Sequence, residues 1–144
     1  MIIPDANLLL YAYDSESPFH RPAARWWGAL LSGEEPVGLC PVVLFGFLRL
    51  ATHAKVFARP LTVAEATKRI RSWLAQPNVR LLYPGPRHLD TVCGLLEAAS
   101  TAGNLVSDAQ IAALALEYGA TIHTADTDFA RFNGLIWKNP LAAN

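Results

Sequence analysis

Residues 107–128 read SDAQIAALALEYGATIHTADTD and combine a helical pattern, a stop signal and a strand pattern in one short stretch. Apolar side chains recur every three or four residues, which predicts a helix over Ser107–Tyr118. Gly119 follows as a C-terminal cap would, and the short apolar run Ala120–Thr124 predicts a buried strand. A helix that leads directly into a buried strand indicates an α/β protein.

The same alternation of short apolar runs and helical stripes extends over the whole chain. Further strands are predicted at Met1–Pro4, Val37–Cys40, Val79–Tyr83 and Leu135–Trp137. Further helices are predicted at Asn7–Tyr13, Pro18–Leu31, Val42–Ala51, Val63–Ala75 and Arg87–Ala99. Because strands joined by helical crossovers run parallel, we expect a three-layer α/β/α sandwich with a central parallel sheet of about four to five strands. No repeat or linker divides the chain, so we expect a single domain over residues 1–144.

The charge balance, the apolar stretches and the cysteines of the chain limit the binding partners and the cellular compartment that we expect. The chain has 12 basic and 12 acidic side chains, so any contact with nucleic acid has to be local rather than driven by a global positive field. The first residues do not resemble a secretory signal and no apolar stretch is long enough to span a bilayer, so we expect a cytoplasmic protein without membrane contact. Cys40 and Cys93 match no metal-ligand spacing, and we predict that both lie in the core.

Acidic residues gather where the predicted strands end. Asp5 directly follows the first strand, and Asp126 and Asp128 follow the strand Ala120–Thr124. Asp108 precedes the apolar positions of its helix by three, four and seven residues, so its side chain should point toward the packed side. Clustered carboxylates raise one another's pKa unless a divalent cation holds them, and oxygen ligands suit Mg²⁺ or Mn²⁺. We interpret these acids as metal ligands, although Asp5 or Asp126 alone would also cap the next helix, and an aspartate in the first turn of a helix would also complement the helix dipole.

Four polar residues stand near the acids, and each has an ordinary structural alternative. Asn7 would orient a carboxylate or a water molecule, or cap a helix. Thr124 would hydrogen-bond Asp126 or a substrate phosphate, or simply end a strand. Asn104 would contribute to the site, or form a turn with the preceding glycine. Arg49 would bind phosphate, or extend along apolar surface and pair with a nearby acid.

Several segments together carry a resemblance to a known family: Pro4–Asn7, Asn104–Ala109, Thr124–Phe132, Phe47–Thr52 and Trp137–Leu141. In their order and spacing they resemble the VapC toxins, which are PIN-domain ribonucleases of type II toxin–antitoxin systems. The resemblance covers nearly the whole chain and implies an α/β/α fold, one or two Mg²⁺ or Mn²⁺ ions and endonucleolytic cleavage of RNA. It also implies a homodimer and a small VapB-type antitoxin as partners.

The family's acidic residues carry over incompletely. The first, third and fourth family acids fall on Asp5, Asp108 and Asp126, the predicted catalytic residues, with Asp128 as an auxiliary ligand. Many relatives have a glutamate where this chain has Gly46, and losing one anionic ligand should weaken metal binding. We hypothesise that Asp128 compensates. The alternative is a catalytically weakened PIN-fold binding module that retains antitoxin and RNA contacts.

The predicted reaction is hydrolysis of an RNA phosphodiester without a covalent protein intermediate. His123 is the nearest candidate for proton transfer, and an ordinary strand-end histidine is the alternative. A phosphatase of the haloacid dehalogenase type would need a second aspartate where this chain has Asn7, and no glycine-rich turn for dinucleotide binding follows the first strand. Four aromatic residues would cover an antitoxin interface or, as we expect, pack in the core: Trp26, Trp27, Phe45 and Phe57.

Overall fold

The structure is a computed structural model that describes residues 1–142. Its elements are, in chain order, β1 (Ile2–Pro4), α1 (Ala6–Tyr13), α2 (His20–Ser32), β2 (Val37–Leu39), α3 (Pro41–Ala51), α4 (Val63–Leu74), β3 (Val79–Leu81), α5 (His88–Ala99), α6 (Leu105–Tyr118), β4 (Thr121–His123), the 3₁₀ helix η1 (Thr127–Arg131) and β5 (Trp137–Lys138). Every predicted strand and helix has a counterpart within a few residues. The helix η1 was not predicted, and α6 begins two residues earlier than expected.

All strands of the sheet run parallel, in the order β3-β2-β1-β4-β5. The chain therefore builds outward from β1 in one direction with β2 and β3, and in the other with β4 and β5. In parallel sheets the crevice at such a reversal, beyond the carboxyl ends of the strands, is the usual binding site. Register pairs Ile3 with Ile122 and Pro4 with His123, so Asp5 leaves the sheet beside the residue that follows β4.

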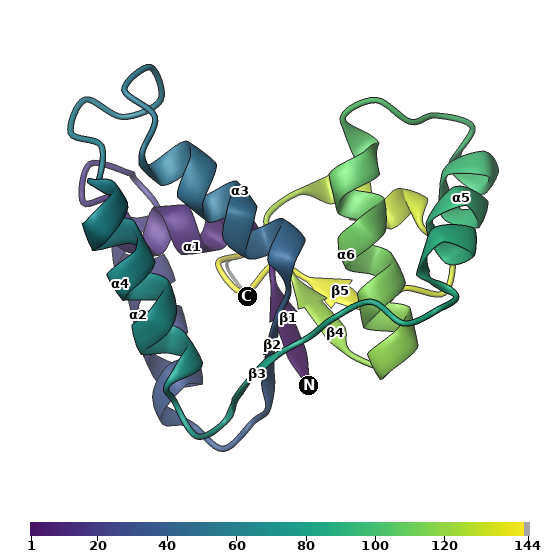
Figure 1. Cartoon of the computed structure of the whole chain (residues 1–144), viewed down its shortest axis with the longest axis horizontal. Helices are drawn as coiled ribbons and strands as arrows, with labels where there is room; N and C mark the ends of the chain where they lie inside the picture. The colour runs from purple at the N-terminus through teal and green to yellow at the C-terminus, as the bar shows by residue number, and fades with distance from the viewer. Residues whose placement is uncertain (143–144) are drawn as a thin grey trace.

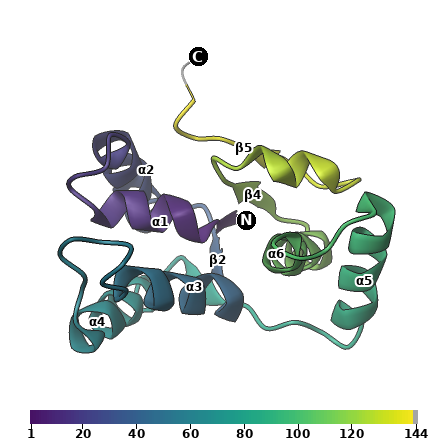
Figure 2. The same ribbon diagram turned by 90° about the horizontal axis from the view of Figure 1, so that it is seen from above.

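Helices flank the sheet on both sides, which confirms the three-layer prediction. Helices α1 to α4 lie together on one side of the central strands, and α5 and α6 lie on the other (Figure 1). The view from above shows the same division (Figure 2). Helix α6 leads down into β4, opposite to the direction of the strands, so its first turn lies toward the carboxyl edge of the sheet (Figure 1).

A continuous apolar core joins the sheet to the helices, and its largest fully buried side chains include Phe47, Phe129 and Leu114. A chain of aromatic contacts crosses the side formed by α1 to α4: Trp26 with Trp27 at 5.6 Å, Trp27 with Trp73 at 5.5 Å, and Trp73 with Phe47 at 4.9 Å between ring centroids. Rings at these separations in tilted or edge-to-face arrangements attract one another beyond their area of burial. These contacts pack α2, α3 and α4 against one another on this side of the sheet.

Two predictions about core residues were wrong. Cys40 is buried as expected, but Cys93 is exposed, because the peripheral helix α5 buries only Val92. Phe45 is 66% exposed, because it lies on the outer face of α3, away from the buried positions of that helix. Trp27 is buried as predicted, whereas Trp26 and Phe57 are partly buried and pack against the core.

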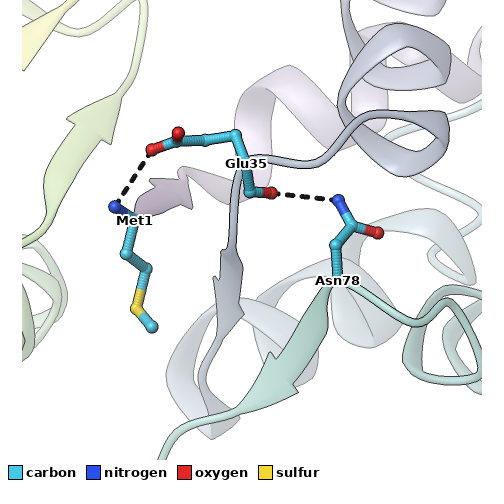
Figure 3. A network of polar contacts seen from close by, with 3 residues as sticks. All are labelled: Met1, Glu35 and Asn78. Atoms are coloured by element: carbon cyan, nitrogen blue, oxygen red, sulfur yellow. Dashed lines mark hydrogen bonds and ion pairs between the residues drawn. The ribbon is translucent and has the colours of Figure 1, made fainter.

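The amino edge of the sheet is held by a polar network (Figure 3). The amino group of Met1 lies 3.1 Å from Oε1 of Glu35. The side-chain amide of Asn78 donates to the carbonyl oxygens of Leu30, at 2.8 Å, and of Glu35, at 3.0 Å. These contacts join the beginnings of β1, β2 and β3. Across residues 1–142, the helices are all too short or too polar to cross a membrane.

Candidate metal centre at the carboxyl edge of the sheet

Asp5 and Thr124 meet at the ends of the two central strands. The main-chain N–H of Asp5 donates to the carbonyl of His123 at 2.9 Å, which extends the pairing of β1 with β4 by one residue. Thr124 is fully buried, and its hydroxyl donates to Oδ2 of Asp5 at 2.8 Å. The same hydroxyl oxygen accepts the main-chain N–H of Asp126 at 2.9 Å. One hydroxyl group thus fixes acids from two segments that are distant in sequence.

Asp126 and Asp128 are positioned by the start of η1. Oδ1 of Asp126 accepts the main-chain N–H of Asp128 at 2.8 Å, so Asp126 does cap a short helix. Phe129, which is fully buried, anchors this helix to the core. Capping uses one oxygen of the Asp126 carboxylate, which leaves the other oxygen for a ligand. The structural and the functional interpretations of Asp126 are therefore compatible.

Asp108 completes a group of carboxylates. It comes from the first turn of α6, and carboxylate oxygens of Asp108, Asp126 and Asp128 all lie within 4.8 Å of one another. Asp5 is not a member of this closest group, but it lies near enough for its charge to raise the pKa of Asp108. The structure thus brings together all four acids that the sequence singled out.

At this edge, burial and neighbouring negative charges disfavour the ionised forms of Asp5 and Asp108. Burial raises the pKa of Asp5 above its ordinary value, although the hydrogen bond from Thr124 opposes this change. Burial, and then the neighbouring charges of Asp5, Asp126 and Asp128, raises the pKa of Asp108 to about 7. Arg131, whose Nε lies 3.5 Å from Asp128, is the one side-chain cation paired with these acids within the described part of the chain. The negative charges of these acids are therefore only partly balanced by neighbouring side chains of residues 1–142, and a bound cation would stabilise them.

The donor set fits a hard divalent cation. All the grouped ligand atoms are carboxylate oxygens, which suit Mg²⁺, Mn²⁺ or Ca²⁺, whereas zinc sites usually include histidine or cysteine. His123, the nearest histidine in sequence, accepts a hydrogen bond on Nδ1 from the indole of Trp26 at 3.0 Å. Burial lowers the pKa of His123 to about 4, so it is neutral near pH 7. The His123 ring is therefore hydrogen-bonded to Trp26 of α2 and does not donate a proton to the acids.

The other supporting residues remain apart from this hydrogen-bonded core. Asn7 is exposed in the first turn of α1, and Asn104 is exposed in a turn at the start of α6, where Gly103 has a φ of 55°. Arg49 is exposed in the last turn of α3. Within residues 1–142 no hydrogen bond or ion pair joins these three side chains to the acids. The hydrogen bond between Trp26 and His123 was not predicted, because the two residues are 97 positions apart and no local sequence pattern indicates the contact.

Gly46, where many relatives of the family were expected to carry a glutamate, lies in the middle of α3 and next to α1. A Cβ atom at position 46 would lie 3.6 Å from Cβ of Ala6, which is ordinary van der Waals contact. Ala6 directly follows Asp5, so a side chain at position 46 would begin beside the acidic edge. The position therefore accepts a Cβ atom without a clash, next to the residue that follows Asp5.

Sequence comparison identifies relatives over almost the full length. The PIN domain family matches residues 2–135. Ribonuclease VapC33 of Mycobacterium tuberculosis is 54% identical over 141 residues, which cover 98% of this chain and 99% of the relative. Ribonuclease VapC37 of the same species is 44% identical over 142 residues, which cover 99% of each chain.

Solved structures share the fold at much lower identity. The structure of Mycobacterium tuberculosis VapC20, described as a Sarcin-Ricin loop cleaving toxin, matches with a TM-score of 0.70 and 19% identity over 94% of this chain and 97% of the other. A chain of VapBC2 from Rickettsia felis, bound to a promoter DNA fragment, matches with a TM-score of 0.68 and 18% identity over 96% and 98%. With its parallel sheet, acidic edge and these full-length matches, the chain belongs to the PIN-domain family.

Proposed function

We propose that this chain is a divalent-metal-dependent endoribonuclease that acts as the toxin of a toxin–antitoxin pair. The observation that supports this most directly is the approach of the Asp108, Asp126 and Asp128 carboxylates to within 4.8 Å of one another, beside the buried Asp5. The ribonuclease names of relatives that are 54% and 44% identical support the reaction class.

Mg²⁺ or Mn²⁺ would be held by Asp108, Asp126 and Asp128, with Asp5 as a further ligand. When bound, such an ion lowers the pKa of water and neutralises charge that develops on a phosphate during hydrolysis. Thr124 keeps Asp5 and Asp126 in a fixed relation, so these acids need little reorganisation during the reaction. Asp108 holds a proton below about pH 7 in the absence of a cation, so metal binding should release a proton and tighten as the pH rises.

Contacts to RNA would come from individual exposed side chains outside the acidic group. Arg49 is exposed and has no ion-pair partner within residues 1–142, so its guanidinium is available to a phosphate. Asn7 and Asn104 are exposed and flank the segments that carry Asp5 and Asp108. With zero net charge, such contacts suit a short single-stranded or loop segment rather than a long duplex.

A VapB-type antitoxin would bind beside the acids. A cavity of about 490 Å³ is lined by Asn7, by the apolar residues Leu10, Tyr11, Leu50 and Phe57, and by the acidic residues Asp14 and Glu16. An apolar floor with an acidic rim complements a partner segment that carries both apolar and basic side chains. Occupation of this cavity would also restrict the approach of RNA past Asn7.

A homodimer would cover a second surface. Leu81, Tyr83, Leu116 and Tyr118 are exposed, and the Tyr118 hydroxyl donates to the carbonyl of Tyr83 at 3.0 Å. Leu116 also lines a cavity of about 430 Å³ between α5 and α6. Exposed apolar side chains, of which Tyr83 and Tyr118 are in contact here, commonly mark protein interfaces when they form a patch. Light scattering after size-exclusion chromatography of the natural protein and of Tyr83→Glu should show a dimer that the substitution weakens.

Cleavage assays test the proposed reaction. The natural protein, freed of any co-purified partner, is incubated with RNA and Mg²⁺ or Mn²⁺, with and without chelator, beside Asp5→Ala. We expect cleavage that chelator abolishes, that added metal restores and that Asp5→Ala lacks. Cleavage that persists undiminished in chelator would contradict a metal-dependent reaction.

Gly46 favours one alternative function, a binding module with weakened catalysis. Gly46 stands where many relatives have a glutamate, so the site would have one carboxylate fewer, and a Cβ at this position would lie 3.6 Å from Cβ of Ala6. If the natural protein binds RNA without cutting it while Gly46→Glu cuts the same RNA, the binding module is the better description. If both proteins cut, the chain is an enzyme.

A further inference from the structure

The last residue of β4 contacts the acidic site through its main chain. The carbonyl of His123 accepts the N–H of Asp5 at 2.9 Å. The next residue, Thr124, donates its hydroxyl to Asp5 and accepts the N–H of Asp126. A shift of this strand end would therefore move the supports of both acids at once. Whatever holds His123 in place also holds the site.

The side chain of His123 is fixed from the opposite direction by α2. His123 is 4% exposed, and its Nδ1 lies 3.0 Å from Nε1 of Trp26. An indole N–H is only a donor, so Nδ1 accepts and the proton of the neutral ring resides on Nε2. The two rings are also tilted against each other, with centroids 5.9 Å apart. The ring thus has one hydrogen-bonded orientation, set by Trp26.

The arrangement exceeds what filling the core requires. Nε2 of His123 is buried without a hydrogen-bond partner among the described residues, which is unfavourable relative to a group that has one. An apolar residue would fill the same space without that cost. The hydrogen bond to Trp26 is what an apolar residue would not supply, and it joins β4 to the aromatic chain of Trp26, Trp27 and Trp73.

We infer that His123 is a positioning residue of the metal centre: its hydrogen bond to Trp26 anchors the end of β4 to α2 and thereby holds Asp5 and Asp126 in place through the His123 carbonyl and the Thr124 hydroxyl. The inference rests on the proposed function. It assigns to Trp26, which lies outside the acidic edge, an effect on metal affinity.

The test uses Trp26→Phe, which removes the indole donor but keeps an aromatic ring. The matched control is Trp27→Phe in the next position, because the indole nitrogen of Trp27 is buried and has no hydrogen-bond partner among residues 1–142. Mn²⁺ affinity is measured by calorimetry, and exchange of the Asp5 amide hydrogen is measured by NMR without metal. Loss of one hydrogen bond, about 1 kcal/mol, corresponds to a weakening of Mn²⁺ binding by up to roughly fivefold in Trp26→Phe, the full value applying if the whole hydrogen bond is coupled to metal binding. Faster exchange at Asp5 should accompany it, with neither change in Trp27→Phe.

Substitutions of His123 separate positioning from packing. In His123→Asn the side-chain oxygen replaces Nδ1 as acceptor and should retain most of the Mn²⁺ affinity, whereas His123→Leu should lose it. Equal Mn²⁺ affinity and equal Asp5 exchange in Trp26→Phe and Trp27→Phe would overturn the inference. If the natural protein binds no Mn²⁺ and cuts no RNA, the proposed function fails, while the Asp5 exchange rates still decide whether Trp26 positions this edge.

Discussion

The amino and carboxyl edges of the sheet differ in how their polar groups are paired. At the amino edge, the Met1 amino group pairs with Glu35 at 3.1 Å and the Asn78 amide meets two carbonyl oxygens (Figure 3). At the carboxyl edge, oxygen atoms of three carboxylates lie within 4.8 Å of one another, and within residues 1–142 only Asp128 among them pairs with an arginine. Donors meet acceptors at one edge, and like charges meet at the other.

This difference separates groups that stabilise the fold from groups that serve a ligand. Satisfied hydrogen bonds at the amino edge contribute to stability without further partners. Mutual repulsion at the carboxyl edge opposes folding until a cation neutralises it, which is typical of functional sites. Substitutions at the two edges should therefore have opposite effects on stability and activity.

The largest effect is expected for Asp126→Asn. The amide keeps the oxygen that accepts the Asp128 N–H, so η1 should remain capped. RNA cleavage should fall roughly 100-fold or more, because a metal ligand is lost. At the same time the unfolding temperature in chelator should rise, because one repelling charge is removed. Cleavage assays and calorimetry of the same preparation measure both, and a variant that is less stable yet equally active would erase the contrast between the edges.

The next largest effect is expected for Gly46→Glu, which adds a carboxylate to the crowded edge. Mn²⁺ binding should tighten about tenfold and cleavage should increase, because another anionic oxygen becomes available to the ion. Gly46→Gln is the matched control, since it shares the size and the gain in helix propensity but lacks the charge. Equal Mn²⁺ affinities of the Glu and Gln variants would show that position 46 does not reach the metal.

A smaller effect concerns the pH dependence of stability without metal. The pKa of Asp108 is raised from 3.8 to about 7, so the folded protein binds a proton at Asp108 more tightly than the unfolded chain does. The protonated Asp108 therefore stabilises the fold at low pH, and this stabilisation is lost as the pH rises from about 4 to about 7. The pKa of His123 is lowered from 6.5 to about 4, which acts in the opposite direction over nearly the same range. Only a comparison with Asp108→Asn isolates the carboxyl group.

In chelator, the unfolding temperature of Asp108→Asn relative to the natural protein should increase from pH 4 to pH 7 and then level off. Saturating Mg²⁺ should remove this difference or reverse it, because only the natural protein has the Asp108 carboxylate to bind the ion and be stabilised by it. A difference that does not vary with pH would mean that Asp108 titrates normally in the folded protein. Thermal unfolding at matched ionic strength provides the measurement.

The smallest effect is expected at the amino edge. Glu35→Gln should lower the free energy of unfolding by less than about 1 kcal/mol, because the Glu35 side chain is 54% exposed and such pairs contribute little. Cleavage per folded molecule should stay unchanged. A large loss of cleavage in Glu35→Gln would show that the two edges are coupled rather than independent.

The elements that could be predicted from sequence are those with local patterns. Apolar periodicity located the strands and helices, and acids placed just after strands were expected at one edge because parallel strands end together. The hydroxyl that links Asp5 to Asp126 was only partly foreseen, since Thr124 is 119 residues from Asp5. Cys93 and Phe45 were misplaced because residue type does not reveal which helix faces remain uncovered.

Calorimetric titration with Mn²⁺ at pH 8 of the natural protein and of Asp108→Asn tests the metal centre most directly, because it requires neither RNA nor a partner. We predict saturable binding to the natural protein and a loss of at least about tenfold in affinity in the variant. Equal affinity in both proteins, or no binding in a natural protein that still cuts RNA, would contradict a metal centre formed by these acids.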